Sequence, residues 1–297
     1  MEIKTSHVKK VISLVMAVAL VFACMLTFTA CGGAAGDDAA ADADKPTLTV
    51  ALSPDFSPME FVDTSKTGQE QYVGFDITLA NFIAEELGME LVIKPMSFDA
   101  CQAAVQSGNV DISISGYSYT PERAENFNLS DYYYAGENET EQNIIVLADK
   151  AGQFSEAADF AGMTVGAQTA SLQMSLCTSQ LPDTATIKEF GDIGTAVEAL
   201  RNGNIDALAV AQGNGNAIIA NNDNIGFSGF KFTIDVQAEN NVILIQKGND
   251  ELTEKINACL AKAYENGYYG QWYADAQELA GIDTAADVSY DDEGNAE

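Results

Sequence analysis

The sequence is poor in histidine and in basic residues. Its single histidine, His7, lies near the amino terminus, in a segment that we expect to be removed. Beyond that segment no Ser-His or Cys-His nucleophile and no histidine-ligated metal site can form. Lys and Arg number 14 against 44 Asp and Glu, so the formal net charge is −30. This excess of negative charge excludes nucleic acid as a partner. We also predict no catalytic residue, no metal and no cofactor.

Cysteine is also scarce. Three of the five cysteines, Cys101, Cys177 and Cys259, lie beyond the first forty residues, far apart and never in a C-x-x-C arrangement. An odd number does not indicate a disulfide framework, so we expect each to be a small buried hydrophobe. One internal pair is the alternative.

The amino terminus has the layout of an export signal. Lys4, Lys9 and Lys10 precede an apolar run over residues 11–30, and small residues lead to Cys31. The run approaches the length of a membrane span, so an uncleaved anchor helix is the alternative. Residues 28–33 (FTACGG) resemble the lipobox of bacterial lipoproteins, whose cysteine becomes the acylated first residue. Cys24 is a poorer candidate, because cleavage there would leave an apolar tail.

These features predict an exported protein, lipid-anchored to the outer face of the cell membrane. Residues 1–30 are the predicted signal peptide, with Cys31 as the lipid attachment site. Residues 31–45 are rich in Gly, Ala and Asp, which cannot form a core, and we expect a disordered tether there.

One small pattern occurs twice in the remaining chain. Residues 108–111 (GNVD) and 203–206 (GNID) each follow a helix-like segment and precede an apolar β-type run. Gly suits the left-handed end of a helix, and Asp suits the turn that opens a strand. The motifs themselves are structural, but their duplication predicts two similar α/β lobes with a ligand in the cleft between them.

Several further segments carry a family resemblance. They are residues 53–61 (SPDFSPMEF), 73–77 (VGFDI), 115–123 (SGYSYTPER), 162–168 (GMTVGAQ) and 266–273 (NGYYGQWY). In order and spacing they resemble family 3 extracellular solute-binding proteins, the amino-acid-binding proteins that serve ABC importers. The resemblance covers residues 46–280. It implies a two-lobed periplasmic-binding-protein-like fold of type II, each lobe a mixed sheet flanked by helices.

The resemblance also implies a domain plan and a function. Lobe 1 would comprise 46–142 and 246–297, lobe 2 would comprise 148–237, and 143–147 and 238–245 would be hinge segments. The expected function is capture of a small carboxylate-bearing solute, with an amino acid as the favoured class. The protein is expected to be a monomer that closes its cleft over the solute and delivers it to an ABC permease. The alternative is a dehydratase-like enzyme on the same fold. A receptor's sensing lobe would need a second membrane span, and nothing after Ala23 is long and apolar enough.

Arg123 is the principal candidate site residue. Thr120 and Pro121 are a suitable N-cap and first residue of a helix, which places Arg123 in its first turn, where free N–H groups favour an anion. A guanidinium can bind both oxygens of a carboxylate. The alternative is a surface arginine paired with Glu122 or Glu125.

The resemblance supplies further ligand-binding candidates in lobe 1. Ser118 would offer a hydroxyl to the same carboxylate, and Gly116 would let the backbone approach it. Phe56 would cover the apolar part of the ligand, with core packing as its alternative. Of Tyr117 and Tyr119, which alternate along one extended segment, we expect Tyr117 to face the cleft.

In lobe 2 the candidates are Ala170, Ser171, Gln173 and Gln212. Relatives often have Gly-Ser or Gly-Thr at the position of Ala170-Ser171 and close this lobe onto the carboxylate with the hydroxyl and its N–H group. Ser171 would also be the N-cap of the following helix.

Two departures from the family pattern concern the ligand's ammonium. Relatives that bind α-amino acids usually have Asp at the position of Ala211, and many have Asp near Ser53. A buried ammonium without a counter-charge is costly, so other groups would have to replace them. Gln212, Asn214, Asn216 and Glu60 are the candidates to replace them, and Ser53 is itself a ligand-binding candidate by its position. The acidic loop 136–142 is expected to be solvated, with selection of a cationic ligand as the alternative.

Overall fold

The computed structural model describes residues 45–133 and 141–282. The predicted signal peptide, Cys31 and the predicted tether up to residue 44 lie outside the described residues, as do residues 136–140 of the acidic loop. All described residues belong to one unit, 44–297. Within 45–133 and 141–282, no helix combines the length and the apolar composition needed to cross a membrane.

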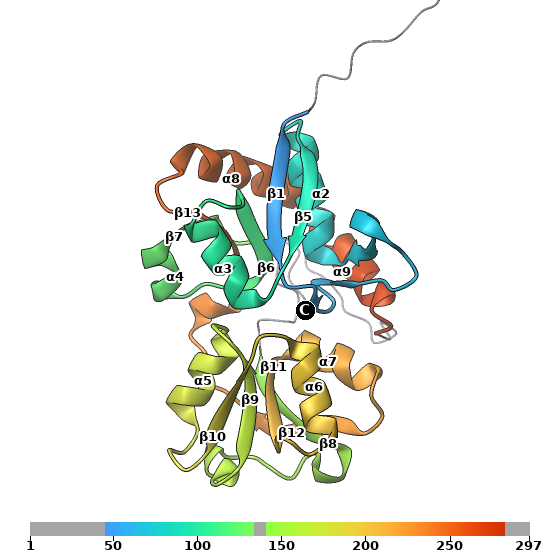
Figure 1. The fold of residues 1–297 in the computed structure, drawn as a ribbon, viewed down its shortest axis with the longest axis vertical. Helices are drawn as coiled ribbons and strands as arrows, with labels where there is room; N and C mark the ends of the chain where they lie inside the picture. Colours follow the sequence, from blue (N-terminus) through green and yellow to red (C-terminus); the bar gives the residue numbers. More distant parts are fainter. Residues whose placement is uncertain (1–44, 134–140, 283–297) are drawn as a thin grey trace, which may run out of the picture. The chain divides into compact units, whose positions relative to one another are not determined.

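Lobe 1 is built on a five-stranded mixed sheet. Its strands are β1 (Thr47–Leu52), β5 (Glu90–Pro95), β6 (Ile112–Ser118), β7 (Phe127–Leu129) and β13 (Asn241–Gln246), in the order β5-β1-β6-β13-β7. β1 is parallel to β5 and β6, whereas β13 is antiparallel to β6 and β7. The helices of this lobe are α2 (Phe75–Glu86), α3 (Phe98–Gln106), α4 (Pro121–Asn126), α8 (Asp250–Glu265) and α9 (Tyr268–Leu279) (Figure 1).

Lobe 2 repeats this plan with the middle of the chain. Its strands are β8 (Gln142–Leu147), β9 (Thr164–Gln168), β10 (Thr186–Phe190), β11 (Ala207–Ala211) and β12 (Ile225–Lys231), in the order β10-β9-β11-β8-β12. β9 is parallel to β10 and β11, and β8 is antiparallel to β11 and β12. The helices are α5 (Leu172–Gln180), α6 (Ile193–Arg201) and α7 (Gln212–Ala220). The predicted class, mixed sheets flanked by helices, is confirmed.

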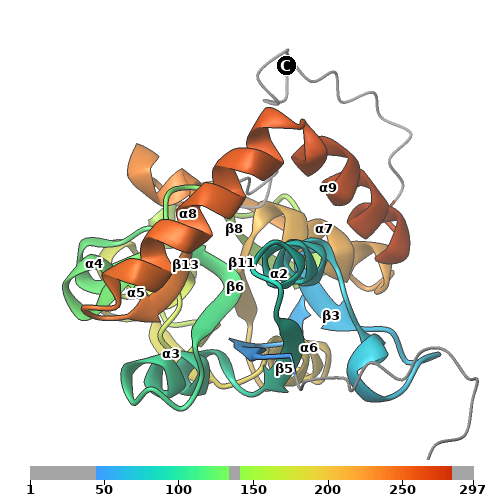
Figure 2. The same ribbon diagram turned by 90° about the horizontal axis from the view of Figure 1, so that it is seen from above.

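Smaller elements complete the described chain. A three-stranded antiparallel sheet joins β2 (Asp55–Phe56), β3 (Glu60–Val62) and β4 (Tyr72–Val73). Short 3₁₀ helices are η1 (Gly68–Gln71), η2 (Ala148–Lys150), η3 (Ala157–Phe160) and η4 (Val236–Glu239). Figure 2 shows α8 and α9 beside α2, and the Phe75 ring on α2 lies 5.9 Å from Tyr269 and 6.1 Å from Tyr273 of α9. The carboxyl-terminal helices therefore pack on the core of lobe 1.

The duplicated turns have equivalent structures. Gly108 and Gly203 have φ angles of 70° and 69°, the left-handed region that glycine enters without strain. The Asp111 carboxylate accepts the N–H of Thr49 on β1 at 2.7 Å, and the Asp206 carboxylate accepts the N–H of Thr164 on β9 at 2.9 Å. Each Asp thus fastens the start of its strand to the next strand.

The segments predicted as hinges, 143–147 and 238–245, contain most of β8 and β13. β8 lies between β11 and β12, and β13 lies between β6 and β7. The links between the two sheets therefore lie outside those two strands. The predicted lobe boundaries stay a prediction.

The three cysteines are buried free thiols, as the sequence indicates. Burial raises the pKa of the Cys101 and Cys177 thiols to about 12. They therefore stay protonated near neutral pH and pack as small hydrophobes.

Candidate functional site

A small, partly open cavity lies where the two lobes meet. Its lining comes from Phe56, Phe98, Ser115, Gly116, Ser118 and Arg123 of lobe 1 and from Gln168, Ser171, Leu172 and Gln173 of lobe 2. About 10 Å³ is open to the centre of a water molecule, which is room for roughly one water. A larger solute can enter only if the lobes separate or the lining side chains move.

Arg123 is the charged side chain of this lining. The N-cap Thr120 accepts the Arg123 N–H at 3.1 Å and starts α4, whose first turn carries the guanidinium. Nη1 donates to the Ser118 carbonyl at 2.6 Å, and Nη2 donates to the Ala170 carbonyl of lobe 2 at 3.2 Å. The side chain is 6% exposed. Arg123 is therefore not a surface arginine, which was the alternative.

Two aromatic rings support the guanidinium. Arg123 Cζ lies 5.6 Å from the ring centre of Phe98 and 5.2 Å from that of Tyr117, distances at which a ring attracts a cation. The two rings are themselves 4.7 Å apart. A buried cation held between aromatic rings and carbonyl dipoles is well placed to pair with an incoming anion.

Phe56 and Gly116 meet at the floor of the cavity. Gly116 has a φ of 55°, and a Cβ built on it would lie 2.6 Å from Cε1 of Phe56. Only glycine lets the ring lie so close to β6. The Gly116 N–H donates to Asp76 Oδ2 at 2.8 Å, so it points away from the cavity and toward α2.

A pair of buried carboxyl groups lies beneath this floor. Glu60 and Asp76 are both 0% exposed; Ser115 donates to Glu60 Oε1 at 2.5 Å, and Asp76 also accepts the Tyr133 hydroxyl. Burial raises the pKa of Asp76 to about 6, opposed by the Gly116 and Tyr133 donors. Burial, followed by the charge of Asp76, raises the pKa of Glu60 well above its usual value. Burial and the neighbouring carboxylate thus both favour the protonated form of Glu60.

On the lobe 2 side, Ser171 begins α5. Its hydroxyl accepts the Met174 N–H at 3.1 Å, as expected of an N-cap, and it lines the cavity. Gln173 also lines the cavity and donates to Gln142 at 2.6 Å. Ala170 has a φ of 61°, unusual for a residue other than glycine, and contributes its carbonyl to Arg123 without lining the cavity.

Three predicted candidates lie elsewhere. Tyr117 is not among the lining residues; its ring packs on Phe98 and Arg123, which do line the cavity, and its hydroxyl lies 2.9 Å from Ser113 Oγ. The expectation that Tyr117 faces the cleft stays a prediction. Ser53 donates to Asp55, and Gln212 is bonded to Asn143 and Asn216, all outside the lining.

The suggested substitutes for the missing Asp residues lie outside the lining as well. Ala211 is 0% exposed and packs in an apolar cluster. Asn214 donates to the Ser57 carbonyl at 3.2 Å, which joins α7 to the first loop of lobe 1. Glu60 lies behind Ser115 rather than in the cavity wall.

Sequence reasoning missed four lining residues, Phe98, Ser115, Gln168 and Leu172. Ser115 and Gln168 lie at the ends of two segments that carry the family resemblance, 115–123 and 162–168. Their place in these segments could have identified them as candidates. Phe98 is the first residue of α3, and its approach to Arg123 depends on how α3 packs against β6. No local pattern marks it.

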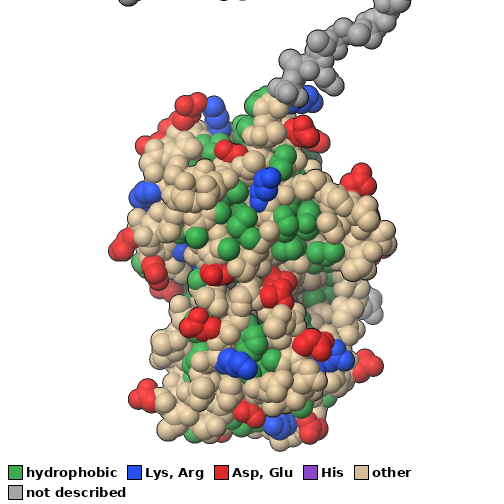
Figure 3. Space-filling model, in the orientation of Figure 1, with side chains coloured by type: hydrophobic (Ala, Val, Ile, Leu, Met, Phe, Trp, Pro, Cys, Tyr) green, Lys and Arg blue, Asp and Glu red, His purple; other side chains and the backbone are tan. Residues whose placement is uncertain are grey.

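No group of three or more His, Cys, Asp or Glu in residues 45–133 and 141–282 is arranged to hold a metal ion. The charges of the surface are dispersed as well. On the face shown in Figure 3, Lys and Arg side chains lie singly among Asp and Glu.

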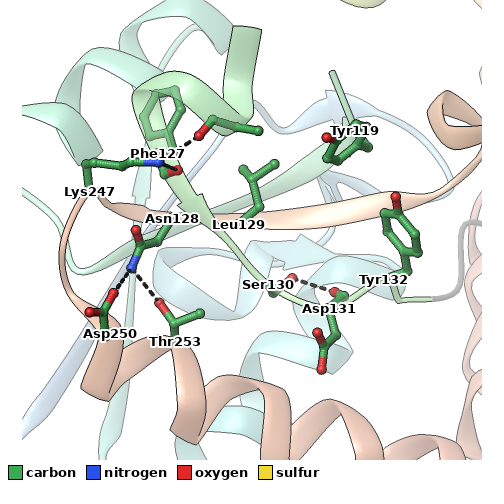
Figure 4. Close-up of a pocket in the computed structure, with 11 residues that line it drawn as sticks. Tyr119, Phe127, Asn128, Leu129, Ser130, Asp131, Tyr132, Lys247, Asp250 and Thr253 are labelled. Atoms are coloured by element: carbon green, nitrogen blue, oxygen red, sulfur yellow. Dashed lines mark hydrogen bonds between the residues drawn. The ribbon is translucent and has the colours of Figure 1, made fainter. Parts of the chain in front are cut away.

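A second, open hollow lies on lobe 1, with a volume of about 660 Å³. Figure 4 shows its lining, in which Lys247 donates to the Ala124 and Phe127 carbonyls and Asn128 donates to Asp250 and Thr253. These polar groups satisfy one another, so the arrangement does not itself indicate a ligand.

Comparison with known proteins supplies independent findings. The model of the family described as "Bacterial extracellular solute-binding proteins, family 3" matches residues 48–275. Over 262 residues the chain is 29% identical to the arginine-binding extracellular protein ArtP of Bacillus subtilis, covering 87% of this chain and 94% of that protein. Over 267 residues it is 30% identical to a probable histidine-binding protein of Neisseria gonorrhoeae, covering 86% of this chain and 93% of that protein.

A solved structure agrees in fold. The amino acid ABC transporter substrate-binding protein AbpA of Streptococcus pneumoniae, bound to L-arginine, superposes with a TM-score of 0.72 at 32% sequence identity. The match covers 80% of this chain and 97% of that one.

Proposed function

The chain belongs to the bacterial extracellular solute-binding proteins of family 3, and from this premise we propose that it binds an amino acid by its carboxylate and delivers it to an ABC transporter. The relatives named for arginine and histidine support an amino acid as the ligand class. Proteins of this family bind and release their solute outside the cytoplasm.

The position of Arg123 carries the proposal. The guanidinium is buried in a cavity that both lobes line, and its Nη2 already contacts a carbonyl of lobe 2. A carboxylate entering there would meet the guanidinium, the Ser118 hydroxyl and the first turn of α5 behind Ser171. These groups favour an anion by charge and by the dipole of the helix.

Closure of the lobes is the proposed mechanism. The cavity has room for roughly one water, so the ligand must enter a more open arrangement and be enclosed afterwards. A ligand favours the closed arrangement only through contacts that it makes better there. Ligand contacts from lobe 1 and lobe 2 together meet this requirement.

The remaining parts of the proposal concern attachment and partners. Acylation at Cys31 would tether the protein to the outer face of the membrane, with residues 31–45 as the spacer. We propose a monomer whose closed form is recognised by the permease.

The test is ligand binding by the purified chain from residue 46 onward, measured by calorimetry and by thermal unfolding against free amino acids. An amino acid at a hundredfold excess over its Kd should stabilise the protein by about 2.7 kcal/mol. Arg123→Ala should abolish this response. Arg123→Lys should also lose at least about tenfold in affinity, because an ammonium cannot form the two parallel bonds.

Glu122→Ala is the matched control, because Glu122 is an exposed first-turn residue of α4 that does not line the cavity. It should bind as the parent does. Undiminished affinity in Arg123→Ala would overturn the site. Binding of carboxylates without an amino group, and of no amino acid, would overturn the ligand class but not the capture mechanism.

A further inference from the structure

Asp55 crosses from one lobe to the other. It lies on β2 of lobe 1, in the loop that also supplies Phe56 to the cavity. Its Oδ2 accepts the backbone N–H of Ile193 in lobe 2 at 2.6 Å and lies 3.4 Å from Nε2 of Gln168. Its Oδ1 accepts the Ser53 hydroxyl at 2.7 Å, which fixes the carboxyl group on the lobe 1 side.

Ile193 is the first residue of α6, where the helix has N–H groups without an internal partner. The helix's own N-cap, Asp192, accepts the Thr195 N–H at 2.7 Å. The Ile193 N–H is left for Asp55. The first turn of α6 is therefore capped by two carboxyl groups, one from each lobe, at the helix end that favours negative charge.

We propose that Asp55 is a positioning residue for ligand capture, a latch that holds lobe 2 closed over the cavity by accepting the Ile193 N–H. This inference rests on the proposed function, because closure matters to capture only if a solute is bound. The bond exists only when the lobes are together, whereas the Asp192 cap lies within lobe 2 and is kept in any arrangement. Gln168, which lines the cavity, donates to Asp55 Oδ2, the oxygen that also accepts the Ile193 N–H. A single side chain, that of Gln168, therefore separates the latch from a bound solute.

The latch depends more on an oxygen acceptor than on a full negative charge. Burial raises the pKa of Asp55 to about 6, and the nearby Asp192 charge adds to this, while the Ile193 and Ser53 donors oppose it. A neutral side chain with a carbonyl oxygen can still accept the Ile193 N–H. Asp55→Asn is thus the conservative variant, and Asp55→Ala is the variant that removes the acceptor.

The experiment measures affinity and lobe separation in the chain from residue 46 onward. Calorimetry gives Kd for L-arginine, L-histidine and δ-guanidinovalerate, which is arginine without its α-amino group. Pulsed EPR between labels at the exposed positions Glu85 of lobe 1 and Thr178 of lobe 2 gives the closed fraction. Asp192→Ala is the comparison variant, because it removes the helix's own cap and keeps the Asp55 acceptor for the Ile193 N–H, while it also removes the negative charge next to Asp55.

Asp55→Ala should weaken binding by about tenfold, with a smaller closed fraction at equal ligand concentration, and Asp55→Asn should stay within about threefold of the parent. Asp192→Ala should lower the thermal midpoint with little effect on Kd. An unchanged Kd and closed fraction in Asp55→Ala would overturn the latch while leaving the proposed function intact.

Three other outcomes are decisive. An equal loss of affinity in Asp192→Ala would mean that α6 stability, not the contact between lobes, governs binding, and the latch would be wrong. A loss confined to L-arginine and absent for δ-guanidinovalerate would make Asp55 a ligand contact instead. A parent protein that binds no amino acid and no carboxylate would refute the proposed function, and the latch with it.

Discussion

Gly116 shows how much a single residue can decide in this cavity. Its φ of 55° is strained for any other residue, and a Cβ would also meet the Phe56 ring at 2.6 Å. Gly88 has a comparable φ of 66° but nothing within 4 Å of a built Cβ. The two glycines therefore separate the cost of the backbone angle from the cost of the clash.

Gly88→Ala should destabilise the protein by about 1 kcal/mol through the backbone angle alone. Gly116→Ala should cost about 2–4 kcal/mol, because the Phe56 ring must also move, and ligand affinity should fall with it. Urea unfolding measures the first effect and calorimetry the second. Equal losses of stability in the two variants would show that the ring yields without cost.

The buried pair Glu60 and Asp76 predicts an unusual dependence of stability on pH. The pKa of Asp76 is about 6 in the folded protein and near 3.8 when unfolded, so the folded state holds more protons between these values. The free energy of unfolding should therefore fall as pH rises from about 4 to 6, and this contribution should be constant above. Asp55, with a pKa of about 6, acts in the same direction.

Asp76→Asn tests this dependence by urea unfolding at pH 4.5 and pH 7. Asn cannot titrate, so the loss of stability between the two pH values should be smaller than in the parent, by about 1–3 kcal/mol. Glu60→Gln should change the stability less than Asp76→Asn does, since burial already favours the uncharged form of Glu60. Parallel pH profiles of the parent and Asp76→Asn would show that Asp76 is not the titrating group.

At the scale of elements, α5 has both a structural and a proposed binding role at its first turn. Ser171 caps α5 by accepting the Met174 N–H, as Asn249 caps α8 by accepting the Leu252 N–H. Ser171→Ala and Asn249→Ala should each cost about 1 kcal/mol of stability. Only Ser171→Ala should also weaken ligand binding, as measured by calorimetry. A loss of affinity in neither variant would leave Ser171 with its capping role alone.

Strand alternation alone does not decide which residues of β6 line the cavity. Ser115 and Gly116 are consecutive, so a regular strand would point them to opposite faces, yet both line it. The left-handed φ of Gly116, 55°, interrupts the extended backbone between them and Tyr117. Tyr117 packs on Phe98 and Arg123 without lining the cavity itself.

For the whole molecule, the excess of acidic residues has a consequence for stability. The sequence has a formal net charge of −30, and like charges repel most in the compact state. Raising NaCl from about 10 mM to 150 mM shortens the range of this repulsion to about 8 Å. Weaker repulsion should increase the free energy of unfolding, and the thermal midpoint should rise by about 2–4 °C for each kcal/mol of that increase. A midpoint independent of salt would show that the charges are too far apart to matter.

The two-lobed plan of the molecule followed from local chemistry repeated along the chain. The turns at Gly108 and Gly203 are specified by residues within a few positions of one another, because the left-handed angle and the aspartate bonds are local requirements. The helix N-caps Thr120, Ser171 and Asp192 are likewise specified by residues within one turn of them. The order of these segments indicated the family, and the family model and the solved structure support it.

The sequence by itself thus determined the fold class and the family, since both depend on the order of short-range patterns along the chain, whereas the structure was needed to show that the three cysteines are free thiols. Only the tertiary structure decided what surrounds Arg123, which is Phe98 and Tyr117 on one side and the Ala170 carbonyl on the other. It alone brought Asp55 to Ile193, 138 positions away in the chain. Such contacts depend on the packing angles of whole helices and lobes, which no local pattern encodes.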